Sequence, residues 1–202
     1  MSWKNDQVSE SETQKILELA RGQLNSDGDF VEFGCYAGDT SILLAEILRN
    51  SSHKLYLYDS FDGLPEKTAA DQSEIGKDFQ KGALFTTKTD LKKRFLRANL
   101  PVPIIKKAWF SDLNPVTDLP SKISFAFLDG DFYDSIKTSL TLVLPKMSAN
   151  SVLLIHDYNN PALPGVAKAV HEALPETLLQ FACVYGTILI IQKKLALDAC
   201  KC

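Results

Sequence analysis

The sequence predicts an α/β fold, namely a Rossmann-like, doubly wound and mostly parallel sheet that ends in a C-terminal antiparallel hairpin. Helical periodicity alternates with short apolar runs along the chain, as in strand–helix–strand units. The run 152–155 is wholly apolar, as in a strand buried on both faces. Gly186 separates two runs of β-branched or aromatic residues, which permits an antiparallel pair. A chain of 202 residues is the length of one domain, so we expect a single domain over 1–202.

The first half of the chain predicts a leading helix, two strands, a helix between them and an insertion. Apolar residues at helical spacing mark the helices, and short apolar runs mark the strands. The leading helix spans about residues 11–22 and is broken by Asp27-Gly28-Asp29. Residues 66–88 are polar with few spaced apolar anchors, which indicates a mobile, lid-like insertion. The predicted elements are helices Ser11–Gly22 and Thr40–Arg49 and strands Phe30–Gly34 and Lys54–Tyr58.

The second half continues the same alternation and adds the hairpin. Three strands are joined to helices, so that five strands with helical crossovers form the parallel part of the sheet. The predicted helices are Asp90–Leu100, Ser135–Met147 and Gly165–Leu174. The predicted strands are Val102–Lys106, Ile123–Leu128, Ser151–Ile155, Gln180–Tyr185 and Thr187–Gln192. Ligands of such sheets bind beyond the carboxyl ends of the strands.

The composition favours small-molecule partners. With 45% hydrophobic and 23% charged residues and a net charge of -3, the chain has a core to bury and no basic surface for nucleic acid. No apolar run approaches the roughly 20 residues of a membrane span, and the polar N-terminus lacks the features of a signal peptide. Four cysteines without a dense framework fit a reduced, cytoplasmic setting. Cys200 and Cys202 are expected to be a plain tail rather than a metal or lipid site.

Glu32 and the glycines that follow the first strand form the first candidate site. Gly34 and Gly38 allow a tight turn at the start of a helix, where free N–H groups face a ligand. Tyr36 and Asp39 stand where a dinucleotide fingerprint needs glycine, so the pyrophosphate interpretation fails. A carboxylate at Glu32 instead attracts the ammonium group of an amino-acid-bearing cofactor. A plain tight turn is the alternative.

Asp59 and an aromatic pair form the second candidate site. An acid at the end of the second strand can accept hydrogen bonds from both ribose hydroxyls, although it can also be a turn former before Gly63. Trp109 and Phe110 follow the third strand, where they either flank an adenine ring or pack in the core.

Carboxylates gather after the fourth and fifth strands. Asp129, Asp131 and Asp157, together with His156, are expected at one sheet edge. Carboxylates that converge repel each other unless they are protonated or bridged by a cation such as Mg²⁺. Helix capping and turn formation are the alternative for some of these acids.

Several segments together resemble the macrocin O-methyltransferase-like family of class I S-adenosylmethionine-dependent methyltransferases. These are VEFGCYAGDTS, LYDSFDGLPE, KGALF, KKAWFSDL, FAFLDGDFYDSIKTSL and HDYNNPALPGVAKAV, which cover roughly residues 29–172. The stretches D-S-F-x-G-L-P and L-D-G-D-x-Y-x-S are the specific ones. The resemblance implies a class I methyltransferase fold and O-methylation of sugar or other natural-product hydroxyls with a divalent metal.

The resemblance also implies roles for particular residues. Asp129 and Asp157 match the metal-binding acids, and Asp131 matches a candidate general base. S-adenosylmethionine is expected to contact Glu32, Gly34, Tyr36, Gly38, Thr40, Ser41, Asp59, Ser60, Trp109 and Asp129.

His156 departs from the family pattern, which has an acid at this position. Imidazole binds Mg²⁺ poorly, so the metal is weaker, different or absent. Alternatively His156 is the general base, because an ordinary imidazole titrates near neutral pH, or it is a supporting residue behind the site.

These observations predict a cytoplasmic S-adenosylmethionine-dependent O-methyltransferase that acts on a small-molecule hydroxyl. Asp131 or His156 removes the proton, and a metal at Asp129 and Asp157 steadies the oxygen. Acceptor selectivity must come from the 66–88 insertion, the leading helix or a partner subunit of a homo-oligomer. The alternatives are an NAD(P)-dependent Rossmann-type oxidoreductase and a non-catalytic cofactor-binding protein.

Overall fold

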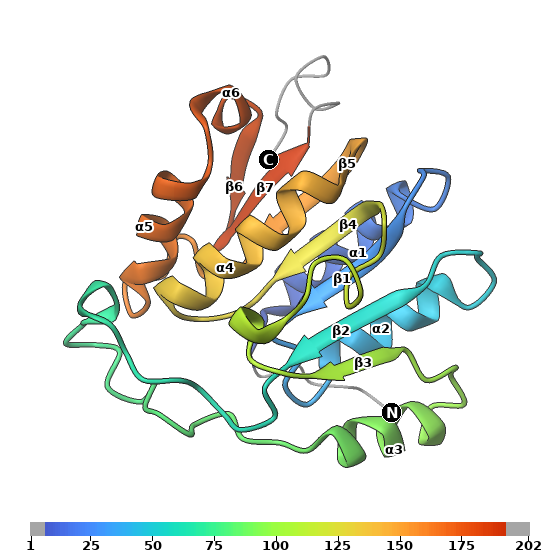
Figure 1. Cartoon of the computed structure of the whole chain (residues 1–202), viewed down its shortest axis with the longest axis horizontal. Coiled ribbons are helices and arrows are strands. Elements are labelled where there is room, and N and C mark those ends of the chain that lie inside the picture. Colours follow the sequence, from blue (N-terminus) through green and yellow to red (C-terminus); the bar gives the residue numbers. More distant parts are fainter. Residues whose placement is uncertain (1–6, 193–202) are drawn as a thin grey trace.

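A computed structural model describes residues 7–192 as a seven-stranded sheet with helices on both faces (Figure 1). The strand order is β3-β2-β1-β4-β5-β7-β6, and within this sheet β7 alone runs against its neighbours. The predicted doubly wound sheet with a terminal antiparallel hairpin is confirmed. The strands are β1 Asp29–Phe33, β2 Leu55–Asp59, β3 Ile104–Lys107, β4 Ile123–Leu128, β5 Met147–Ile155, β6 Ala182–Tyr185 and β7 Ile188–Gln192.

Two apolar layers hold the helices against the sheet (Figure 1). Alternate strand residues point to opposite faces, so that Phe125 and Phe127 of β4 join the layer under α1, α2 and α3, whereas Ala126 and Leu128 join the layer under α4 and α5. Both faces of the central strands are therefore covered, as parallel sheets require. The helices are α1 Glu10–Gly22, α2 Asp39–Leu48, α3 Lys88–Arg97, α4 Tyr133–Val143, α5 Pro164–Ala173 and the short α6 Glu176–Leu179.

The end of one predicted helix and the start of one predicted strand were wrong, and both errors lie at prolines, Pro145 and Pro103. The helix predicted over Ser135–Met147 ends at Val143, and a 3-10 turn Leu144–Lys146 follows, because proline lacks an N–H for the helix. Met147 belongs to β5 instead, which begins earlier than the predicted Ser151. Likewise β3 begins at Ile104 rather than Val102.

The connections differ from the prediction in two further places. Residues between β3 and β4 contain only the 3-10 turn Phe110–Asp112, so this crossover is not helical. Gln180 follows α6 and is not in a strand. The hairpin turn comprises both Gly186 and Thr187, since Tyr185 pairs with Ile188.

The predicted insertion, residues 66–88, is anchored at Asp71. It has no strand and only the 3-10 turn Ala69–Asp71 before α3 begins at Lys88. The Asp71 side chain is fully buried and accepts hydrogen bonds from Thr68 N (2.8 Å), Thr68 Oγ1 (2.7 Å) and the backbone N–H of Tyr133 (2.7 Å). Because Tyr133 is the first residue of α4, one carboxylate joins the insertion to the turn that carries Asp131.

The leading helix α1 is joined to the hairpin through Glu12. Its Oε1 accepts hydrogen bonds from Thr187 N (2.7 Å) and Thr187 Oγ1 (2.8 Å), and its Oε2 caps the helix at Ser9. None of the helices within residues 7–192 has the length and apolar character of a bilayer span. The predicted Cys200–Cys202 tail lies outside the described residues.

Replacing Asp71 by Ala leaves the Tyr133 amide N–H without its acceptor. We expect the free energy of unfolding to fall by about 2–4 kcal/mol, because a buried donor is left unsatisfied. Asp78→Ala, an exposed position in the same insertion, is the matched control and should change stability by less than about 0.5 kcal/mol. Chemical denaturation of both variants checks this, and equal losses would contradict the anchoring role.

Candidate active site

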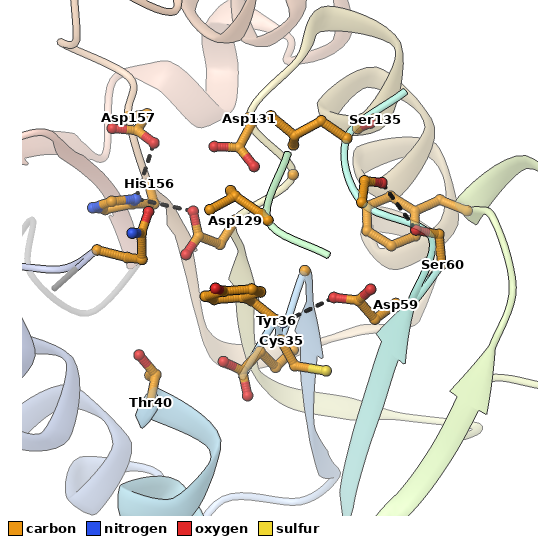
Figure 2. A pocket seen from close by; sticks show the side chains of 18 of the residues that line it. Cys35, Tyr36, Thr40, Asp59, Ser60, Asp129, Asp131, Ser135, His156 and Asp157 are labelled. Atoms are coloured by element: carbon orange, nitrogen blue, oxygen red, sulfur yellow. Dashed lines mark hydrogen bonds and ion pairs between the residues drawn. The ribbon is translucent and has the colours of Figure 1, made fainter. Parts of the chain in front are cut away.

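One cavity of about 290 Å³ opens at the carboxyl ends of β1, β2, β4 and β5. Every predicted site residue except Ser41 lines this cavity: Glu32, Gly34, Tyr36, Gly38, Thr40, Asp59, Ser60, Trp109, Asp129, Asp131, His156 and Asp157. Figure 2 shows the labelled side chains from these elements facing a common space. The topology therefore brings together residues that are far apart in the sequence, as expected for the carboxyl edge of a parallel sheet.

The glycine loop after β1 touches the end of β4. Gly34 has φ +86°, and a Cβ placed on it would lie 1.9 Å from the carbonyl oxygen of Asp129. Glycine is thus required at position 34 for a close approach of two backbones. Gly38 has φ +87° and is the N-cap residue of α2, and the first two residues of that helix, Asp39 and Thr40, line the cavity with it.

Glu32 is buried in the cavity wall, with 2% of its surface exposed. Its Oε2 accepts a 2.5 Å hydrogen bond from the hydroxyl of Ser41, which lies behind Glu32 and not on the cavity surface. Burial, with smaller contributions from nearby carboxylates, raises the pKa of Glu32 to about 8. The unliganded protein therefore holds a carboxyl whose ionisation a cationic ligand would favour.

Asp59 closes the loop at the end of β2. Its Oδ2 accepts a hydrogen bond from Tyr36 N (2.8 Å) and its Oδ1 one from Phe61 N (2.7 Å). The second bond spans two residues, as in the turn former considered from the sequence, and the first ties β2 to the glycine loop. Burial raises the pKa of Asp59 despite these donors.

Trp109 and Phe110 lie in different surroundings. Phe110 packs edge-on against Phe33, with ring centroids 5.1 Å apart. Trp109 lines the cavity and is 38% exposed. It is therefore not packed in the core, which was the alternative to a place beside an adenine ring. Ser60 is buried and its hydroxyl donates to Gly63 O (3.2 Å), which shapes the turn beside Trp109.

His156 lies between two carboxylates (Figure 2). Its Nδ1 is 2.9 Å from Asp129 Oδ1 and 3.1 Å from Asp157 Oδ2. The ring is buried, with 5% exposed. Burial disfavours the imidazolium, but Asp129 and Asp157 outweigh it and raise the pKa of His156 to about 11. This shift favours a charged ring that donates at neutral pH, which argues against the general-base interpretation of His156.

Asp131 has a different environment. It follows Gly130 with a left-handed backbone (φ +59°), which an L-residue other than glycine adopts at a cost of about 1 kcal/mol or more. In Figure 2 its carboxylate points into the cavity. Burial and the charges of Asp129 and Asp157 raise its pKa well above the usual range, which makes the ionised carboxylate a stronger proton acceptor.

The residues at this edge do not fit the Mg²⁺ site that the resemblance implies. Asp129, His156 and Asp157 have ligand atoms within 4.8 Å of one another, but Mg²⁺ prefers an all-oxygen, octahedral set. Here an imidazole nitrogen faces both carboxylates at hydrogen-bond distance. The methyl transfer proposed for this site therefore involves no metal ion.

Sequence reasoning missed several cavity residues. Asn160 donates from Nδ2 to Asp157 Oδ1 (2.8 Å), and its place in the segment after the fifth strand could have revealed it. Gln7 and Val8 precede α1 and also line the cavity, as do Phe79 and Leu84 of the insertion. Of these four, Leu84 lies in the KGALF segment of the insertion from which acceptor selectivity was expected, and the other three carry no local motif.

Together, the strand order with reversed β7, the acid near the end of β1 with the two glycines that follow the strand, and the acid ending β2 define the class I methyltransferase fold. The family model for macrocin O-methyltransferase (TylF) matches residues 13–177. The chain therefore belongs to the macrocin O-methyltransferase family, as the sequence resemblance indicated.

Curated relatives are natural-product O-methyltransferases by name. The chain is 28% identical over 154 residues to the 8-demethyl-8-(2,3-dimethoxy-alpha-L-rhamnosyl)-tetracenomycin-C 4'-O-methyltransferase of Streptomyces olivaceus, covering 72% of this chain and 57% of the relative. It is 26% identical over 155 residues to the mycinamicin III 3''-O-methyltransferase of Micromonospora griseorubida, covering 72% and 59%. The chain thus spans less than two thirds of the length of these relatives.

Solved structures share the fold. The O-methyltransferase NovP has a TM-score of 0.75 at 23% identity, over 89% of this chain and 78% of that one. An O-methyltransferase from Bacillus cereus, solved in complex with SAH, has a TM-score of 0.60 at 14% identity, over 94% and 84%.

Glu32→Gln should raise the stability of the protein at pH 8 while weakening its binding of S-adenosylmethionine. The glutamine keeps an acceptor for Ser41 but cannot ionise. Because the folded-state pKa of Glu32 is raised to about 8, the wild-type protein loses stability as pH rises from its unfolded pKa toward 8. We expect the variant to be more stable than wild type at pH 8 by about 1–3 kcal/mol, with the difference shrinking toward pH 5.

The same variant should lose most of the thermal shift that S-adenosylmethionine gives the wild-type protein. Melting curves at both pH values, with and without the ligand, measure both effects. Glu74→Gln, at an exposed position of the insertion, is the control. A Glu32→Gln protein that is less stable at pH 8 and still binds the ligand normally would refute this role.

Proposed function

We propose that the protein transfers the methyl group of S-adenosylmethionine to a hydroxyl of a small molecule, such as a sugar or another natural product. The observation that carries the proposal is that one cavity contains both the Glu32–Gly38 loop and the carboxylate of Asp131. The names of the curated relatives support the same reaction and acceptor class. Membership of a methyltransferase family removes the basis for the NAD(P)-dependent alternative.

The cofactor would lie along the β1 and β2 ends of the cavity. S-adenosylmethionine supplies a methyl group activated by its sulfonium charge. Glu32 faces the loop where the amino-acid part would bind, and Asp59 is placed to meet the ribose. Trp109, exposed at the rim, offers a flat surface to the adenine. Gly34, Tyr36, Gly38, Thr40, Ser60 and Asp129 complete the proposed contact surface.

Asp131 is the proposed general base. The acceptor oxygen gains the methyl carbon, the carbon–sulfur bond breaks, and the hydroxyl proton passes to the Asp131 carboxylate, leaving neutral S-adenosylhomocysteine. His156 is not the proposed base, because the carboxylates of Asp129 and Asp157 beside its Nδ1 raise the pKa of the ring to about 11 and favour the charged form at neutral pH. In Figure 2 its other ring nitrogen lies on the far side of the ring from Asp129.

Cavity residues that lie outside the sheet and its glycine loop would select the acceptor. Phe79 and Leu84 come from the 66–88 insertion, and Gln7 and Val8 come from the chain before α1. We propose that the part of the insertion that follows Asp71 acts as a lid over the cavity. We also propose that the chain is one domain of a cytoplasmic protein. A partner subunit of a homo-oligomer would contribute further to acceptor selectivity. The Mg²⁺ ion implied by the resemblance has no part in this proposal.

Asp131→Asn should abolish catalysis while leaving cofactor binding intact. Asparagine tolerates the left-handed backbone at this position but cannot accept the proton, so we expect kcat to fall about 10²–10⁴-fold. Asp134→Asn, an exposed acid three residues along, should retain activity. Methyl transfer from labelled S-adenosylmethionine to a panel of sugars and phenols provides the assay, after thermal shifts with S-adenosylhomocysteine, NAD and NADP confirm the ligand.

A normal rate for Asp131→Asn would show that another group is the base. If S-adenosylhomocysteine gives no thermal shift, the methyltransferase proposal fails. If it does, but no acceptor in the panel is methylated by the wild-type protein, the result favours a non-catalytic cofactor-binding protein.

A further inference from the structure

The two acids that the family resemblance assigns to a metal, Asp129 and Asp157, have a protein side chain between them. His156 Nδ1 lies 2.9 Å from one carboxylate and 3.1 Å from the other. A single N–H thus bridges the pair across the gap between the carboxyl ends of β4 and β5. Without a shared donor or cation, carboxylates at such separations repel each other.

His156 is held in this place from several sides. Its backbone N–H donates to Leu128 O (2.9 Å), which continues the pairing of β4 with β5. Its ring lies edge-on to Phe127, with centroids 6.2 Å apart. With 5% of its surface exposed, the ring has little room to turn away from the acids.

The second acid is also occupied by protein donors. Asp157 Oδ1 accepts from Asn160 Nδ2 (2.8 Å) while its Oδ2 faces His156. Asn160 Oδ1 in turn accepts from Ala162 N (3.0 Å), which fixes the orientation of the amide. Both oxygens of Asp157 therefore face nitrogen atoms of protein side chains.

We infer that His156 takes the place of a divalent metal in this protein, by bridging Asp129 and Asp157 with a hydrogen-bond donor, so that the site works without a bound ion. That the site is catalytic rests on the proposed function. The geometry of the three side chains stands by itself. The role of His156 is that of a positioning residue, because it holds Asp129 and Asp157 beside the cavity without taking the proton.

The experiment compares wild-type protein with His156→Asp, which restores the acid of the family pattern, and with His156→Asn, which removes the imidazole without adding a carboxylate. Thermal melting and calorimetric titration with MgCl₂ and MnCl₂ are measured on the full chain after treatment with EDTA. We expect no metal effect on the wild-type protein or His156→Asn, and a saturable rise in melting temperature with metal for His156→Asp. The readout is binding, so it does not depend on knowing the acceptor.

Saturable binding of either ion by the wild-type protein would overturn the inference. So would a folded His156→Asp protein that ignores both ions, because the acids would then not form a metal position. If His156→Asp does not fold without metal, it is refolded with and without MgCl₂. Refolding only with MgCl₂ supports the inference. Failure to refold under both conditions overturns it. Thermal shifts with S-adenosylhomocysteine, run alongside, report separately on the proposed function.

Discussion

The structure depends on keeping many carboxylates around one partly enclosed cavity. Each acid that lines it, apart from Asp131, has a hydrogen-bond donor or cation among the described residues. Arg94 of α3 pairs with Asp39, Ser41 donates to Glu32, backbone N–H groups donate to Asp59, and His156 bridges Asp129 and Asp157. Because like charges at these distances would otherwise destabilise the fold, the donors are as much a part of the site as the acids.

The pairing of acids with donors also distinguishes two kinds of carboxylate in the cavity. Donors satisfy the acids that shape the walls, whereas Asp131 directs its carboxylate into the space. Asp131 and Asp157 both have left-handed backbones, with φ +59° and +57°. Strain of this kind persists where surrounding structure enforces it, and it is concentrated at functional sites. The enforcing structure here includes Asp71, whose carboxylate accepts the N–H of Tyr133 two residues after Asp131. The insertion thus supports the position of the proposed base.

Much of the fold and of the cavity could be predicted from the sequence, because strand ends in a parallel sheet meet at one edge. Once the runs 30–34, 54–58, 123–128 and 151–155 were identified as strands, the side chains at or just after their carboxyl ends had to converge, which brings Glu32, Asp59, Asp129 and His156 together. Proline was the main source of error: the periodicity that predicted a helix through Met147 took no account of Pro145, whose missing N–H ends α4.

Other features of the site depend on distances that no local pattern encodes. The sequence showed that His156 replaces an acid but left three roles open, and its position between two carboxylates supports the positioning role that we propose. Gln7 and Val8 line the cavity just before α1, the helix that Glu12 joins to the hairpin at Thr187 by a contact across 175 residues.

The close approach of Gly34 to the carbonyl of Asp129 has a consequence for where the cavity can change shape. Two backbones in contact cannot separate without disrupting the β1–β4 pairing, so this side of the cavity behaves as a fixed wall. The side formed by Gln7, Val8, Phe79 and Leu84 belongs to segments outside the sheet. A change in the shape of the cavity is therefore expected from these segments and not from the paired strands.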